Sequence, residues 1–382
     1  MHEILATLGA ALMGVLAPAA PQNPQDVLAH EITAVQTGSG VVGLAGAVMQ
    51  DGRLVAMAAS GERALGSGEP VSAEGPWHVG SLTKSMTAVM IATMVEDGLL
   101  TWDTTLADIY GTDIDPSWHA VTMTDLLTHR SGAGGSIPVG MMLAPRPTSR
   151  EDVSAQRQDI VRSVLNKPAP GQRGTFTYSN MGVIIAGAVT EKIAGHPWED
   201  EMESRVFRPL GLQGGFGAPM GDDAPRGHRR TLFMRRAINP TTPGSDNPPF
   251  LGPAGTVHMP LPDLVAYGQF HLSEQPGILS RETLDQLHQA VPDTGQKPVH
   301  YAYGWVVEAD GHDIGAGPVI WHNGSNTMWY ALLILFPERD TVMAFTANEM
   351  TDDLQGHLFD IAETMAKTLD MSEPAPSTQA EN

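Results

Sequence analysis

The chain contains no cysteine and only five lysines among its 382 residues. Without cysteine, neither a disulfide framework nor thiol catalysis is possible, and redox chemistry says nothing about the compartment. The motifs of several other catalytic scaffolds are also missing, because no Gly-x-Ser-x-Gly, His-Glu-x-x-His, His-x-His or P-loop pattern occurs. We therefore expect neither an α/β-hydrolase nor a metallohydrolase, and no cofactor is implied.

Positive charge is scarce, with 22 basic residues against 43 acidic ones and a formal net charge of −21. This balance argues against nucleic acid or an anionic membrane as a partner. Beyond the N-terminal residues, no apolar segment is long enough for a transmembrane helix, and no repeat of solenoid length is present. The length allows a large core in one compound domain or two closely joined ones. The oligomeric state stays open.

The most informative pattern is Ser-x-x-Lys, formed by Ser81 and Lys84 at the start of an apolar segment that predicts a buried helix over 83–96. One helical turn separates the two residues, so the hydroxyl and the amine can touch. A serine hydroxyl needs a base to become a nucleophile, and a desolvated lysine can be that base. We predict Ser81 as the nucleophile and Lys84 as its base or proton shuttle. The alternatives are a helix-capping serine and a surface lysine.

Two further patterns follow along the chain: Tyr178 and Asn180 form Tyr-x-Asn, and His322-Asn323-Gly324 stands ahead of an apolar run. In this order the three patterns resemble the motifs of the serine β-lactamase and penicillin-binding-protein superfamily. The most similar branch contains class C β-lactamases, D,D-peptidases, D-aminopeptidases and family VIII esterases. The similarity extends from about residue 43 to about residue 349, with further landmarks at 126–132, 170–171 and 303–305.

The resemblance implies a role for the residues that match these motifs. It places Tyr178 against Ser81 and Lys84, where the phenol relays protons. It also implies that the backbone N–H groups of Ser81 and Ser325 form an oxyanion hole, which would supply a large part of the rate enhancement.

The same resemblance implies a substrate-binding set of Asn180, His322, Gly324 and Ser325. Asn180 can donate to and accept from the flank of an ester or amide, although a helix N-cap role is the alternative. Gly324 would let a substrate approach the strand edge without a side chain in the way.

His322 occupies a position that holds lysine in many β-lactamases, whereas histidine is found there in several D,D-peptidase and esterase relatives. A neutral or partly charged imidazole is a weaker anchor for a carboxylate than an ammonium. This departure favours an esterase over a β-lactamase. The alternative interpretation is a strand histidine whose ring is hydrogen-bonded by the backbone.

Hydrophobic patterning predicts strands near both ends of the chain and helices between them. The expected strands are 41–49, 54–60, 303–308, 319–322, 330–336 and 341–347. Further helices are expected at 122–127, 151–165, 180–194 and 354–369. Residues 211–250 show no hydrophobic period. We therefore expect a long loop region of the kind that often forms a lid or site wall.

This order implies an α+β fold, and the family resemblance adds an antiparallel sheet flanked by helices with an inserted, mostly helical domain. We predict a sheet domain formed by 23–80 and 253–370 and a mostly helical domain with a loop region over 81–252. Residues 371–382 are expected to form a disordered tail.

The N-terminal residues 1–22 resemble a secretory signal peptide, with an apolar run from Ile4 to Leu16 followed by small residues. No lysine or arginine precedes the run, which departs from the usual pattern. Export to the periplasm or the exterior is the prediction, with a packed N-terminal helix of a cytoplasmic protein as the alternative.

Two other patterns receive no catalytic role from the sequence. Ser245-Asp246-Asn247 copies a motif of class A enzymes, but it follows Tyr178 in the chain, where that motif does not belong. A basic cluster is expected to be a solvated loop paired with acidic groups, with capture of an anionic substrate group as the alternative. The cluster consists of Arg226, Arg229, Arg230, Arg235 and Arg236.

These observations predict a serine hydrolase that works through an acyl-serine intermediate on small esters or β-lactam-like amides, without metal or cofactor. A β-lactamase and a D-amino-acid (D,D-) peptidase are the alternatives within the same chemistry. A penicillin-binding or sensor protein that is acylated without turning over is the alternative from another class.

Overall fold

The computed structural model of the chain describes residues 23–231, 234–273, 277–291, 300–309, 311, 314 and 317–369. The predicted signal peptide (1–22) and the predicted tail (371–382) lie outside the described residues. Within the described part of the chain, no helix combines the length and the apolar character that crossing a membrane requires.

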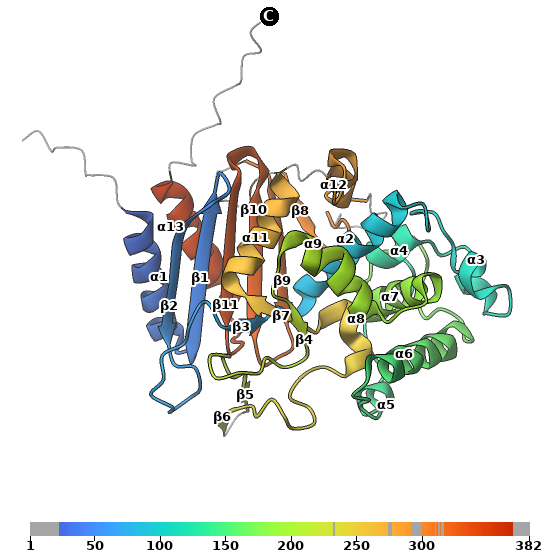
Figure 1. Cartoon of the computed structure of the whole chain (residues 1–382), viewed down its shortest axis with the longest axis horizontal. Helices are drawn as coiled ribbons and strands as arrows, with labels where there is room; N and C mark the ends of the chain where they lie inside the picture. Colours follow the sequence, from blue (N-terminus) through green and yellow to red (C-terminus); the bar gives the residue numbers. More distant parts are fainter. Residues whose placement is uncertain are drawn as a thin grey trace, which may run out of the picture.

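A six-stranded antiparallel sheet forms one half of the molecule, in the order β2-β1-β11-β10-β9-β8 (Figure 1). Its strands are β1 (Gly43–Gln50), β2 (Arg53–Gly61), β8 (Val306–Glu308), β9 (Val319–Ser325), β10 (Tyr330–Phe336) and β11 (Thr341–Ala347). A tight turn at Asp51 and Gly52 joins β1 to β2, and both residues have positive φ, 49° and 69°. That geometry fits a turn whose twist matches the flanking strands.

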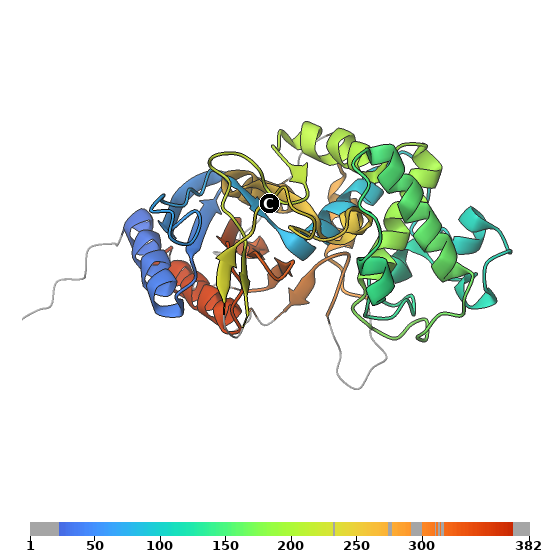
Figure 2. The ribbon, with the colours of Figure 1, turned by 90° about the horizontal axis from the view of Figure 1, so that it is seen from below.

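The central strands β10 and β11 are buried on both faces, which explains why they read as continuous apolar runs. Alternate residues of β11 enter two different cores. Val342 and Ala344 belong to the core that also contains α11 (Leu261–Leu272), whereas Met343 and Phe345 pack with α1 (Pro24–Ser39) and α13 (Leu354–Thr368). Figure 2 shows α1 and α13 on one side of the sheet.

Helices from the middle of the chain gather beside the sheet (Figures 1 and 2). The helices predicted at 83–96, 122–127, 151–165, 180–194 and 354–369 are present as α2, α4, α6, α7 and α13. The helices are α1 (Pro24–Ser39), α2 (Thr83–Glu96), α3 (Leu106–Tyr110), α4 (Met123–Leu127), α5 (Val139–Met142), α6 (Arg150–Leu165), α7 (Asn180–Ala194), α8 (Trp198–Met202), α9 (Arg208–Leu210), α10 (Gly252–Gly255), α11 (Leu261–Leu272), α12 (Arg281–Leu287) and α13 (Leu354–Thr368). Shorter helical turns are η1 (Gly80–Leu82), η2 (Pro116–Trp118), η3 (Glu203–Phe207), η4 (Pro249–Leu251) and η6 (Pro337–Arg339).

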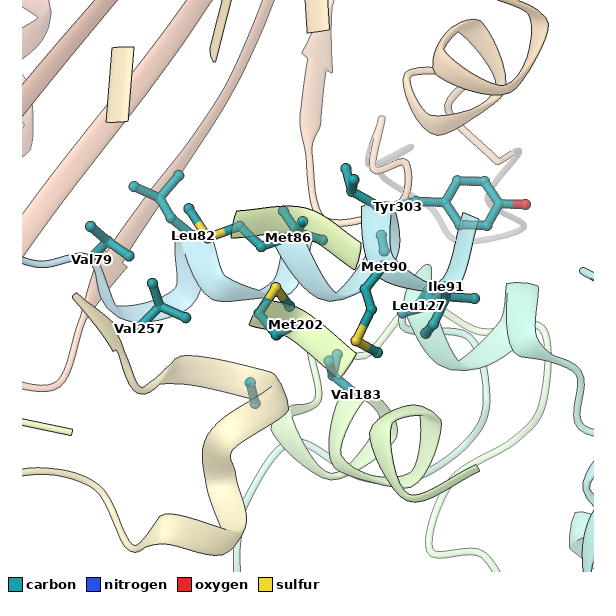
Figure 3. Packing of buried hydrophobic residues seen from close by; sticks show 14 of the residues in the cluster. Val79, Leu82, Met86, Met90, Ile91, Leu127, Val183, Met202, Val257 and Tyr303 are labelled. Carbon is teal, nitrogen blue, oxygen red and sulfur yellow. The ribbon is translucent and has the colours of Figure 1, made fainter. Parts of the chain in front are cut away.

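Helix α2 lies at the junction of the two halves and is buried along most of its length. Figure 3 shows Met86 and Met90 of α2 in one cluster with Val183 of α7, Met202 of α8 and Val257 of β7. The α+β fold is therefore confirmed, while the exact domain boundaries stay a prediction. The packing fixes the start of α2, where Lys84 lies, and with it the preceding turn η1, which contains Ser81.

The prediction of a structureless loop over 211–250 is wrong in part. Strand β4 (Gly215–Phe216) joins β7 (Val257–Pro260) and β3 (Pro76–His78) in a three-stranded sheet, and β5 (His228–Arg230) pairs with β6 (Arg235–Ala237). Strands of two or three residues are too short to show a period, and the β5–β6 hairpin carries arginines instead of an apolar face.

Strand β9 lies directly against the turn η1, and two glycines make this approach possible. A Cβ added to Gly324 would lie 2.0 Å from the carbonyl oxygen of Val79 and 2.5 Å from the nitrogen of Ser81. A Cβ added to Gly80 would lie 2.4 Å from the nitrogen of Ser325, and Gly80 has a positive φ of 54°. Gly324 is thus needed by the protein's own backbone, a reason the sequence did not suggest.

We expect Gly324→Ala to lower the free energy of unfolding by at least about 2 kcal/mol, because a methyl group cannot fit against the backbone of η1. Urea denaturation would measure this loss. Gly356→Ala is the matched control, since no atom lies within 4 Å of a Cβ added at that position of α13. The control is expected to be neutral or stabilising by up to about 1 kcal/mol. Equal stability of the two variants would contradict the close approach of β9 and η1.

Candidate active site

Ser81 and Lys84 are in contact at the start of α2. The Lys84 Nζ donates hydrogen bonds to the Ser81 Oγ over 2.9 Å and to the carbonyl oxygen of Ala254 over 2.7 Å. Both alternative interpretations are wrong, because Lys84 is buried and Ser81 caps neither η1 nor α2 with its side chain. The hydroxyl therefore lies beside an amine that could take its proton.

The environment of Lys84 favours the neutral amine. Burial lowers the pKa of Lys84, and the neighbouring Tyr178 hydroxyl acts in the opposite direction through charge and a hydrogen bond. The Lys84 Nζ lies 5.0 Å from the ring centre of Tyr178. Because a charged ammonium is poorly solvated in this position, a free amine forms at lower pH than in an exposed lysine, as a general base requires.

Tyr178 sits on the loop before α7 and is 37% exposed, so it is not a core tyrosine. Its ring lies 4.4 Å from that of His129 and 6.2 Å from that of His322, measured between ring centres. His129 Nδ1 accepts a hydrogen bond from the backbone N–H of Ser179 at 3.2 Å, and burial holds the pKa of His129 well below its usual range. A neutral imidazole thus fixes the backbone next to Tyr178.

His322 is buried in β9, and the protein itself engages both ring nitrogens. Its Nε2 is hydrogen-bonded to the Tyr301 hydroxyl at 3.0 Å, and its Nδ1 to the carbonyl oxygen of Asn323. Burial, and then the charge of Lys84, lower the pKa of His322 to about 3. The ring is therefore neutral near pH 7, and its contacts match the interpretation of a strand histidine bonded within the protein. The sequence did not single out Tyr301 as its partner.

Asn180 is the first residue of α7, and the helix is capped by its neighbour. The Ser179 Oγ accepts from the N–H of Gly182 at 3.1 Å, so the capping alternative for Asn180 is wrong. The Oδ1 of Asn180 is buried and has no hydrogen-bond partner among the described residues. Asn180 and Ser81 line the same cavity, of about 320 Å³. The amide could therefore accept a hydrogen bond from a bound molecule.

Ser325 lines the same cavity at the end of β9. Its Oγ donates to the carbonyl oxygen of Trp329 at 2.7 Å, so the hydroxyl is engaged within the protein. The backbone of Gly324 and Ser325 runs along that of Gly80 and Ser81. Two backbone amides beside one serine can stabilise negative charge that develops on a carbonyl oxygen.

A buried carboxylate, Asp246, links the two sides of this amide pair. It accepts hydrogen bonds from the Asn326 Nδ2 at 2.7 Å and from the His78 Nε2 at 3.1 Å. The His78 Nδ1 in turn accepts from the N–H of Gly80 at 3.1 Å. One carboxylate thus connects the residue before Ser81 with the residue that follows Ser325 along the chain.

Asp246 and Asn247 were not predicted as site residues, yet both line the cavity with Ser81. The local sequence does not predict this position in the cavity wall, because the contacts join segments far apart in the chain. Two arginines complete the wall: Arg146, which donates to the carbonyl oxygens of Asp246 and Asn247 at 3.0 Å each, and Arg229 of β5. The described residues contain no group of three or more acidic or histidine side chains that could hold a metal ion.

Comparison with known proteins places this geometry in context. The chain is 26% identical to penicillin-binding protein 4 of Amycolatopsis lactamdurans over 339 residues, which are 82% of this chain and 83% of that protein. It is 28% identical to the lovastatin esterase of Penicillium rubens over 227 residues, 54% of this chain and 55% of the esterase.

The fold also resembles that of the D-amino acid amidase from Ochrobactrum anthropi SV3, with a TM-score of 0.73, 18% identity and coverage of 92% of this chain and 99% of that chain. At this identity the likeness concerns the fold alone. The family model described as beta-lactamase matches residues 28–365, nearly the whole described chain. The chain therefore belongs to the beta-lactamase family of serine hydrolases and penicillin-binding proteins.

Proposed function

We propose that this protein is a serine hydrolase. Small carboxylic esters acylate Ser81, and the acyl-serine is then hydrolysed. The observation that carries the proposal is the 2.9 Å contact between Lys84 Nζ and Ser81 Oγ, made by a buried amine whose pKa is lowered. The neighbouring backbone amides of Ser81 and Ser325 and the cavity beside them supply the remaining requirements of acyl transfer.

In the proposed reaction, neutral Lys84 takes the proton of the Ser81 hydroxyl as its oxygen attacks the ester carbonyl. The amides of Ser81 and Ser325 stabilise the oxyanion. The proton then passes from Lys84, directly or through the Tyr178 hydroxyl, to the departing alkoxide. Water enters, gives a proton to the same pair and attacks the acyl-serine. The bond to the Ser81 oxygen then breaks, that oxygen takes the proton back from the pair, and the carboxylic acid is released.

Esters are favoured over β-lactams by the neutral imidazole of His322. With a pKa of about 3, His322 carries no charge to attract the carboxylate of a penicillin or cephalosporin at neutral pH. The similarity to an esterase is consistent with this choice. The alternatives, a β-lactamase, a D-amino-acid peptidase or an acylated protein without turnover, share the acylation step and differ in the substrate or in deacylation.

Ser81→Ala should abolish turnover of every substrate, because no other group can form the acyl intermediate. A serine-reactive phosphonate should label the wild type at Ser81, with the site identified by peptide mass spectrometry. Ser163→Ala, on the exposed part of α6, serves as the control and should keep full activity. An adduct found on another serine would overturn the assignment.

Lys84→Ala and Tyr178→Phe should each lower kcat by about a hundredfold or more, because each removes part of the proton relay. If the two act as one unit, the double variant should be little slower than the slower single variant. In the wild type, kcat/KM should rise with pH as Lys84 loses its proton, and this rise should be absent in Lys84→Ala. The surface variant Lys367→Ala is the control. Fully additive losses would contradict a shared relay.

For the wild type we expect kcat/KM for a neutral short-chain ester to exceed that for a chromogenic cephalosporin by at least roughly tenfold, about 1.4 kcal/mol of transition-state stabilisation. The ratio should not fall between pH 8 and pH 5, because His322 stays neutral throughout this range. Faster hydrolysis of the cephalosporin than of every short-chain ester would show that the carboxylate is anchored elsewhere and that the protein acts as a β-lactamase.

A further inference from the structure

The cavity beside Ser81 occupies one side of the proposed reacting centre. Its wall includes Asn180 and Ser325 but neither Tyr178 nor His322. The group that departs from an ester must take up a proton, so it has to lie near Lys84 and Tyr178. The other substituent of the carbonyl carbon, the acyl chain, then extends into the cavity.

The wall of this cavity is partly apolar and partly cationic. Leu251 and the methionines Met142 and Met328 offer apolar contacts, whereas Arg146 and Arg229 bring two guanidinium groups. Within the described residues neither arginine forms an ion pair with a carboxylate.

Each arginine is held by backbone groups of the wall. The Nη1 of Arg146 donates to the carbonyl oxygens of Asp246 and Asn247 at 3.0 Å, and the Nη2 of Arg229 donates to that of Gly244 at 3.2 Å. The carboxylate of Asp246 is directed to His78 and Asn326 instead. Arg146 and Arg229 thus place two guanidinium groups in the wall of the cavity that contains Ser81.

We propose that the cavity binds acyl groups that end in a carboxylate, with Arg229 and Arg146 as the residues that determine this specificity. An apolar spacer would pack against the methionines and Leu251, while the guanidinium groups receive the terminal carboxylate, for which their planar donor geometry is suited. The preferred substrates are then half-esters of dicarboxylic acids. This proposal rests on the proposed acylation of Ser81 and refines its substrate class.

Two kinds of anionic substrate differ in the side of the reacting carbonyl on which their carboxylate lies. In a penicillin or cephalosporin the ring carboxylate is attached on the side of the lactam nitrogen, which is the leaving group. That side faces Tyr178, and the neutral His322 lies near it. In a half-ester the carboxylate belongs to the acyl chain and reaches the arginines. The same site can therefore select one anion and not the other.

The test compares two isosteric substrates, monobenzyl glutarate and the benzyl ester of glutaramic acid, by chromatographic measurement of benzyl alcohol. In the wild type the ratio of kcat/KM, acid over amide, should be on the order of ten, since Arg229 is exposed and its charge is screened. The ratio should decrease as salt is added. A ratio near one or below overturns the proposal without any variant.

The chain offers a matched control for the variant Arg229→Gln. Arg230 is the next residue of β5, and because side chains alternate along a strand it points to the opposite face. Arg229→Gln should reduce the ratio several-fold towards one, whereas Arg230→Gln, which removes the same charge, should leave it unchanged. An equal change in both variants would assign the effect to net charge and reject Arg229 as the determinant.

Failure of this inference and failure of the proposed function give different results. If the neutral amide ester is hydrolysed in a Ser81-dependent reaction but the acid is not preferred, the acyl-binding proposal is wrong and the hydrolase remains. If neither ester is hydrolysed in a Ser81-dependent reaction, the proposed function fails as well.

Discussion

The contact between the backbone of β9 and the turn η1 is the constraint on which the candidate site depends. Gly80 and Gly324 face each other with no room for a side chain between the two segments. This approach joins the sheet to the start of α2 and brings Ser81 and Ser325 into the wall of one cavity. The buried Asp246 reinforces it from a third segment, through His78 on one side and Asn326 on the other.

Burial then determines the protonation states around the serine. It lowers the pKa values of Lys84, His129 and His322, so the groups that surround Tyr178 tend towards their neutral forms. A neutral amine can accept a proton, and a neutral imidazole is a weaker anchor for an anion than an ammonium. Two guanidinium groups, those of Arg146 and Arg229, lie in the cavity wall. In the proposed function, Lys84 and Tyr178 transfer protons, whereas Arg146 and Arg229 recognise the charge of the acyl chain.

Much of the fold and part of the site could be predicted from the sequence because the signals are local. Ser81 and Lys84 are one helical turn apart, so their contact follows from helix geometry once the helix is recognised. The strands β10 and β11 could also be predicted, because each is a long apolar run. Asp246 and Tyr301 could not be assigned, because their contacts join distant segments, and Arg229 could be considered only as one member of a cluster of five arginines. The short arginine-bearing strands β5 and β6 have no hydrophobic period to reveal them.

In the proposed reaction an acyl group is carried on Ser81 during turnover. Mass spectrometry of the intact protein, quenched within milliseconds of mixing with an excess of a short-chain ester, would detect this intermediate. We expect a transient species heavier by the acyl group, with the adduct located on the peptide that contains Ser81. An adduct on another residue, or ester turnover that continues in Ser81→Ala, would contradict the claim.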